Sequence, residues 1–237
     1  MTEIIDKFYA VDFDRCLGNF EANVKLLNEV AEELSVINGD MLQVAHDEIK
    51  ASGIPFRILK YLEENDPNLD LGILQNTYIE RARSKPGSLI EPGAVELIDF
   101  LRLNNHHFCI MTFGETRWQT TKIAASGFGD ITKLIVSHEH KSRHIAEWWD
   151  EKSENFIIPS ECFPDMKSRI AHEVILIDDK ANAFTDLPIG ARGYLVHNAK
   201  SIYSTLNDNI PSSVRRVERL DEIIVHESLV SSLILNC

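Results

Sequence analysis

The chain has 237 residues, with 24 basic and 37 acidic side chains, so its net charge is −13. The length predicts one to two domains, and 44% hydrophobic with 26% charged residues is typical of a globular protein. The acidic balance disfavours nucleic acid and anionic membranes as main partners, because both select a basic surface. Anionic small molecules are not excluded, because a bound divalent cation can reverse the sign of a local site.

Targeting and cysteine patterns indicate the compartment. The N-terminal segment carries acids where a secretory signal carries positive charge, and no apolar run approaches the ~20 residues that span a bilayer. Four cysteines are scattered without a CxxC pair, at Cys16, Cys109, Cys162 and Cys237, which favours free thiols. We therefore expect a cytoplasmic protein without a membrane partner.

Short apolar runs alternate with helical patterns along most of the chain. The first run, Lys7–Asp12, ends in an acid, which is typical of a buried strand whose carboxyl end faces a site. Four further strand-like runs are His107–Thr112, Leu134–Ser137, Val174–Asp179 and Gly193–His197. Helical patterns lie at Gly93–Arg102, with Pro92 at the start, and at Thr116–Ala125. The pattern of the tail Val214–Val225 predicts a strand or loop followed by a helix. This alternation predicts an α/β fold with a Rossmann-like parallel sheet.

Residues 19–88 follow a different pattern. Apolar positions repeat at helical spacing from Val24 to Leu34, and further helical patterns cover Gly39–Ser52, Phe56–Glu64 and Leu71–Arg83. No strand-like run interrupts them, and Ser84–Ser88 has the composition of a return linker. We therefore predict an all-helical domain at 19–88, inserted into an α/β core formed by 1–18 and 89–237.

Polar residues gather where the predicted strands end. Asp12 and Asp14 follow the first strand, Thr112 and Gly114 the second, and the pair Asp178-Asp179 the fourth. Ligands of open parallel sheets bind beyond the carboxyl ends of the strands, so we expect these side chains in one pocket. Four carboxylates there repel one another unless a cation compensates them, and hard oxygen ligands suit Mg²⁺.

In these segments the sequence resembles the haloacid dehalogenase superfamily of aspartate-based phosphohydrolases. Phe8–Leu17 resembles its first motif, an apolar strand followed by DxDx[T/V], with Cys16 at the Thr or Val position. Ile110–Thr112 resembles the second motif, and Val174–Asp179 resembles the fourth, an apolar strand ending in paired acids. The resemblance covers residues 7–197, and it implies a haloacid dehalogenase-like core with a helical cap.

The resemblance implies roles for the acids. Asp12 would be the nucleophile that forms an aspartyl-phosphate, and Asp14 the general acid and base. We expect the crowded acids to raise the pKa of Asp14. Mg²⁺ would be held by Asp12, by the backbone carbonyl of Asp14 and by Asp178, with Asp179 as a further candidate ligand.

Further residues would bind the phosphoryl group. The resemblance assigns its oxygens to the hydroxyl of Thr112 and the amides of Phe113 and Gly114. A lysine should offset the phosphoryl charge, and Lys141 opens a helical stretch after the third strand. It precedes Asp178 by 178 − 141 = 37 residues, which is longer than usual, so we expect an extra loop at 153–164. Lys167 is closer to the fourth strand and stays the alternative.

These features together predict a Mg²⁺-dependent phosphatase acting on a small phosphorylated metabolite. Asp14 argues against the halide-removing branch of the superfamily, which usually lacks that second acid. The alternatives are a phosphomutase on a sugar phosphate and a catalytically silent binding protein with the same fold. Substrate choice would lie in residues 19–88, which offer no motif that identifies a substrate, and the sequence does not predict an oligomeric state.

Overall fold

The computed structural model describes residues 2–34, 43, 47, 57–129, 133–137, 140–197 and 210–234. The helical pattern expected at Gly39–Ser52 lies outside the described residues, apart from Gln43 and Asp47. Among the described helices there is none that is both long and apolar enough to cross a membrane.

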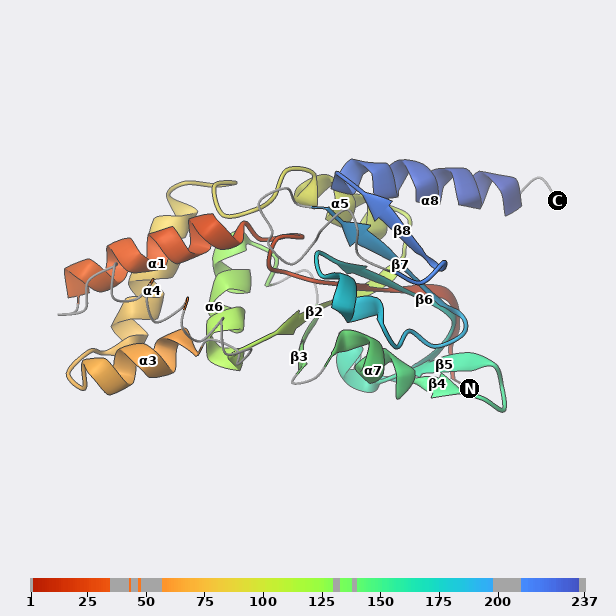
Figure 1. Cartoon of the computed structure of the whole chain (residues 1–237), viewed down its shortest axis with the longest axis horizontal. Helices are drawn as coiled ribbons and strands as arrows, with labels where there is room; N and C mark the ends of the chain where they lie inside the picture. The colour runs from red at the N-terminus through yellow and green to blue at the C-terminus, as the bar shows by residue number, and fades with distance from the viewer. Residues whose placement is uncertain are drawn as a thin grey trace.

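One eight-stranded sheet organises the chain (Figure 1). Six strands run parallel in the order β3 (Lys133–Ser137), β2 (His107–Phe113), β1 (Ile4–Val11), β6 (Arg169–Asp178), β7 (Ala191–Val196) and β8 (Val214–Val217). The hairpin β4 (Trp149–Asp150) and β5 (Asn155–Ile158) adds two antiparallel strands beside β6. The expected parallel α/β sheet is thereby confirmed, with the carboxyl ends of β1, β2 and β6 at one edge.

Helices cover both faces of the sheet and extend beyond its end (Figure 1). Their bounds are α1 (Phe20–Leu34), α3 (Ile58–Asn65), α4 (Leu71–Arg83), α5 (Ala94–Leu103), α6 (Thr116–Ser126), α7 (Lys141–Ala146) and α8 (Leu220–Ile234). Two short 3₁₀ turns lie at Ser160–Cys162 and Ala181–Phe184. The tail therefore forms a strand and then a helix, as expected.

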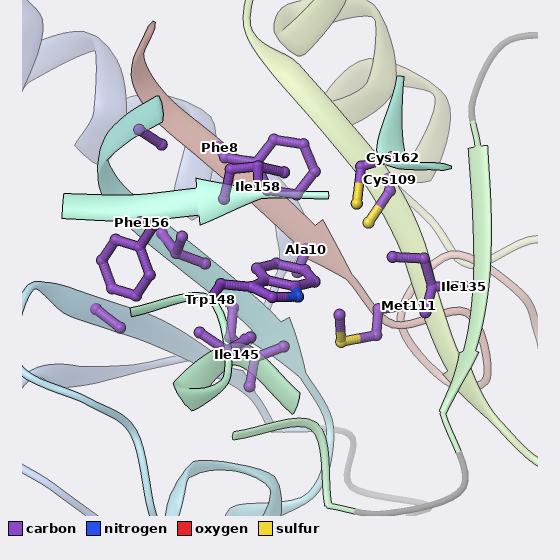
Figure 2. Packing of buried hydrophobic residues seen from close by; sticks show 14 of the residues in the cluster. Phe8, Ala10, Cys109, Met111, Ile135, Ile145, Trp148, Phe156, Ile158 and Cys162 are labelled. Carbon is purple, nitrogen blue, oxygen red and sulfur yellow. The ribbon is translucent and has the colours of Figure 1, made fainter. Parts of the chain in front are cut away.

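Alternation along the buried strands divides the core into two clusters. Phe8 and Ala10 of β1 face a cluster on the side of α7, whereas Tyr9 and Val11 face the side of α5 and α8. Figure 2 shows the first cluster, where the Trp148 ring lies edge-on to Phe8 at 5.9 Å between centroids. A two-sided apolar strand of this kind is typical of a sheet covered by helices on both faces.

The helices α1, α3 and α4 form a third apolar cluster with residues of α6 (Figure 1). The segments that precede α1 and follow α4 lie side by side, because the Asn19 amide donates to the Leu89 carbonyl at 2.9 Å. Asn23 of α1 reinforces the crossing, since its side-chain amide donates to the same carbonyl at 3.0 Å. The two linking segments are therefore held together as one narrow connection.

The region 153–164 differs from the loop expected there. It contains β5 and a 3₁₀ turn, and in β5 the side chains of Phe156 and Ile158 are buried while Ile157 is half-exposed. This strand pairs with Arg169–Ala171, at the start of β6, whereas β7 pairs with Val174–Asp178. The extra residues before Val174–Asp179 therefore form the strand that pairs with the first part of β6.

Candidate active site

Three buried carboxylates meet at the carboxyl edge of the sheet. β1 and β6 are adjacent parallel strands with Val11 opposite Ile177, and the Asp12 amide donates to the Ile177 carbonyl at 2.8 Å. Asp12 therefore lies beside Asp178 and Asp179, and one carboxylate oxygen of each lies within 4.8 Å of the others. All three residues are buried.

Lys141 joins this cluster, and Lys167 does not. The Lys141 ammonium lies 2.6 Å from an Asp12 oxygen and 2.5 Å from an Asp178 oxygen, and the residue is 5% exposed. It is the first residue of α7, and β3 ends at Ser137 earlier in the chain. Lys167 is exposed and precedes the start of β6, at the opposite end of the strand from Asp178. The geometry thus places Lys141 in the position that the sequence left open between the two lysines.

Three carboxylates crowd together here, and Lys141, Lys180 and Arg15 oppose their repulsion without cancelling its effect on Asp12 and Asp179. Burial, together with Asp178 and Asp179, raises the pKa of Asp12 to about 7, although Lys141 opposes the shift. Burial and the neighbouring Asp178 likewise raise the pKa of Asp179 to about 6. Burial alone would lower the pKa of Lys141, but Asp12 and Asp178 raise it above its usual range. A cation bound here would relieve the repulsion.

The donor set fits Mg²⁺. Its atoms are all carboxylate oxygens, which hard divalent cations prefer, and they all lie within 4.8 Å of one another. Asp12, Asp178 and Asp179 would hold the ion. The Asp14 side chain, in contrast, is not a member of this carboxylate group.

Asp14 is instead held by two side chains of α6. Lys122 places its ammonium 2.5 and 2.7 Å from the two carboxylate oxygens, and the Gln119 side-chain amide donates to one of them at 3.2 Å. Although burial opposes ionisation, the charge and hydrogen bonds of Lys122 lower the pKa of Asp14. The expectation that neighbouring acids raise this pKa is therefore wrong, because the buried Lys122 ammonium contacts both oxygens of the Asp14 carboxylate.

Neither α6 residue was predicted from the sequence, although a signal exists. Gln119 and Lys122 are three residues apart, so they share one helical face, and both are buried beside Trp118 and Ile123. A lysine and a glutamine one helical turn apart, flanked by Trp118 and Ile123 just after the Thr112-Phe113-Gly114 segment, indicate a buried polar partner.

The end of β2 and the start of α7 offer buried hydroxyls to a ligand. Thr112 is 1% exposed, and its hydroxyl oxygen has no hydrogen-bond partner among the described residues. Ser142, next to Lys141, has a buried hydroxyl in the same condition within the described part of the chain. A buried hydroxyl without a partner is costly, so both would gain from oxygen atoms of a bound anion.

Glycine is required at the end of the turn after β2. Gly114 has φ +138°, and a Cβ added there would lie 2.9 Å from the Gln119 side-chain nitrogen. Gln119 also donates to the Phe113 carbonyl at 2.9 Å. The same glutamine therefore links the expected phosphoryl-binding turn to the Asp14 carboxylate.

Comparisons with known proteins identify the fold. No family model matches the chain, and no curated protein matches its sequence. A haloacid dehalogenase-like hydrolase from Burkholderia xenovorans LB400 matches with a TM-score of 0.65 and 17% identity, over 94% of this chain and 97% of that one. A protein assigned as a β-phosphoglucomutase from Thermotoga maritima gives 0.50 and 16%, over 95% and 100% of the chains. A protein assigned as a phosphoglycolate phosphatase from Haemophilus somnus gives 0.50 and 12%, over 93% and 98%.

Proposed function

On the premise that the chain has the haloacid dehalogenase-like fold, we propose that it is a Mg²⁺-dependent phosphatase of a small phosphate monoester. One observation carries the proposal: Asp12 lies buried against Lys141 and with two further acids, and the neighbouring strand β2 carries the buried Thr112 hydroxyl. The arrangement combines a carboxylate nucleophile with a positively charged lysine and with further negatively charged acids. Phosphoryl transfer requires groups of both charges. The structural likeness to hydrolases and phosphatases supports the proposal at the level of the fold.

The residues divide the reaction into two steps. In the first, an Asp12 oxygen forms a bond to phosphorus, the ester oxygen leaves, and Asp14 supplies a proton to it. Asp14 must act here in its protonated form, which the Lys122 charge disfavours in the free protein. In the second, a water oxygen bonds to phosphorus while Asp14 takes its proton, and the bond to Asp12 breaks to release inorganic phosphate. Mg²⁺, when bound by Asp12, Asp178 and Asp179, would offset the negative charge of the phosphoryl oxygens.

The remaining residues orient the phosphoryl group. Thr112 and the amides of Phe113 and Gly114 would donate hydrogen bonds to its oxygens, and Lys141 would balance its charge beside Asp12. We propose that the helical insertion is a cap that excludes water and selects the substrate. Its helices α3 and α4 pack against α6, the helix that follows this turn, which supports a position near the site.

Phosphate release tests the proposal. Purified protein should release phosphate from 4-nitrophenyl phosphate, and from at least one member of a panel of phosphorylated metabolites, only when Mg²⁺ is present. Asp12→Asn should abolish the release, whereas Asp186→Asn, which changes an exposed acid paired with Arg143, should keep it. Release that is absent in the wild type, or unchanged in Asp12→Asn, would contradict the proposal.

A phosphomutase remains the second candidate, because the same residues can return the phosphoryl group to a sugar. The structural likeness to the Thermotoga maritima protein motivates it at the level of the fold. Product analysis on sugar phosphates separates the two, since an isomeric sugar phosphate forms in place of inorganic phosphate.

A further inference from the structure

We propose that Lys122 is a positioning residue that holds the Asp14 carboxylate in place for its role as acid and base. The inference rests on the proposed phosphatase function and adds a residue to that site. It follows from the position of Lys122, whose charge lies inside the protein and next to one carboxylate.

Lys122 occupies an apolar surrounding that a lysine rarely tolerates. It is 1% exposed, and its ammonium lies 5.5, 5.6 and 6.0 Å from the ring centroids of Phe13, Trp118 and Phe20. Burying a charge without a partner is very costly. The buried Lys122 ammonium is therefore stable only because both carboxylate oxygens of Asp14 accept hydrogen bonds from it. The pair therefore lacks the freedom of a surface salt bridge.

A second donor fixes the direction of the carboxylate. Gln119 lies one helical turn before Lys122, and its amide bridges an Asp14 oxygen at 3.2 Å and the Phe113 carbonyl at 2.9 Å. Asp14 is thereby held on one side by the helix that begins directly after the expected phosphoryl-binding turn. Because proton transfer requires a heavy-atom separation of about 2.6–3.2 Å, small displacements of this carboxylate should slow the reaction.

The helix that carries Lys122 is itself held from the other side. The Leu59 amide at the start of α3 donates to the Glu115 side chain at 3.0 Å. The Trp118 ring packs edge-on against Tyr78 of α4, with 5.1 Å between centroids. Contacts to the helical insertion thus restrain α6, so that Lys122 has a fixed support from which to position Asp14.

The competing explanation is that the buried ion pair only stabilises the fold. Replacing Lys122 would then lower the amount of folded protein without a specific effect on the chemical steps. The two explanations differ in what happens when Asp14 is already absent, and in which of the two chemical steps is slowed.

The experiment is a double-mutant cycle on 4-nitrophenyl phosphate with Mg²⁺. Lys122→Met, which keeps the length and apolar body of the side chain, is combined with Asp14→Asn, and Lys122→Arg restores the charge. Lys7→Met is the matched control, because Lys7 is also a buried lysine in a carboxylate pair, with Glu227 on the far helix α8. Pre-steady-state release of nitrophenolate and steady-state release of phosphate are measured on folded protein, with folding checked by circular dichroism.

We expect Lys122→Met to lower kcat by about 10²-fold, because general acid–base catalysis contributes 10²–10⁴-fold. KM should fall in proportion, so that kcat/KM stays within about threefold, because only the second step, hydrolysis of the intermediate, is slowed. Nitrophenolate should still appear in a first-turnover burst, since this good leaving group needs little help from an acid, whereas hydrolysis of the intermediate is slow. The double variant should match Asp14→Asn, Lys122→Arg should recover part of the rate, and Lys7→Met should keep the wild-type kcat.

Three results would overturn the inference. Multiplicative losses in the double variant, loss of the burst in proportion to the steady-state rate, or wild-type kcat in Lys122→Met would each show that Lys122 does not act through Asp14. A wild type that releases no more phosphate than Asp12→Asn would instead overturn the proposed function, and the inference with it. The two failures are therefore distinguishable.

Discussion

Binding of Mg²⁺ to the carboxylate cluster should depend on pH, because two of its ligands hold protons near neutrality. With the pKa of Asp12 at about 7 and that of Asp179 at about 6, lowering the pH from 8 to 6 protonates most of Asp12 and about half of Asp179 before the ion binds. The ion requires the ionised forms, so it must displace these protons. The affinity of the cluster for Mg²⁺ should therefore rise as the pH increases from 6 to 8.

The magnitude follows from the two pKa values. At pH 6 the cluster carries roughly 1.4 protons and at pH 8 roughly 0.1, so binding should be about 20-fold tighter at pH 8, or about 1.8 kcal/mol. Calorimetric titration with MgCl₂ at both pH values, in two buffers of different ionisation enthalpy, measures the affinity and the protons released. In Asp179→Asn the pH dependence should shrink to about tenfold. Equal affinity at the two pH values would refute this account of the cluster.

Three other outcomes are expected. Lys141→Met should lower kcat by about 10²–10³-fold, because it removes the cation beside Asp12, and phosphate release by protein with a wild-type circular-dichroism spectrum measures this. Gly114→Ala should cost about 1–3 kcal/mol of stability and reduce activity, since a Cβ meets Gln119 at a positive φ; an unchanged urea midpoint would contradict the reasoning. Glu227→Gln should lower the free energy of unfolding by about 3 kcal/mol at pH 7, because hydrogen bonds outweigh burial and hold the pKa of Glu227 at about 2. That stabilisation is complete above pH 4.5 and fades as the pH falls toward 2, so urea unfolding curves of variant and wild type should converge in acid.

The parallel core could be predicted because its strands leave a clear pattern. Runs such as Val174–Asp179 are apolar on both faces and end in acids, which indicates both the buried strand and the edge where ligands bind. The bounds of α4 also follow from the sequence, because Asp70 accepts hydrogen bonds from Gly72 and Ile73 at its start. Local signals of this kind need no knowledge of distant contacts.

The partners of the site residues were harder to predict because they depend on packing between elements. The choice between Lys141 and Lys167 needs the direction of β6. The spacing to Asp178 alone is unusually long for Lys141 and is shorter for Lys167, the alternative. The lowered pKa of Asp14 needs a lysine that lies 108 residues further along the chain and reaches the carboxylate only when α6 packs against the loop after β1. The spacing of residues in the sequence does not show that α6 brings Lys122 close to Asp14.

The β4–β5 hairpin has a consequence for solubility. β6 is the longest strand, and β7 covers only its second half, so without the hairpin the stretch Arg169–Ala171 would present unpaired backbone groups beside buried apolar side chains. An exposed ladder of this kind is a template for pairing with another chain. By pairing with this stretch, β5 shields the strand that carries Asp178 from intermolecular sheet formation. The new edge of the sheet is the short strand β4, in which only two residues are paired.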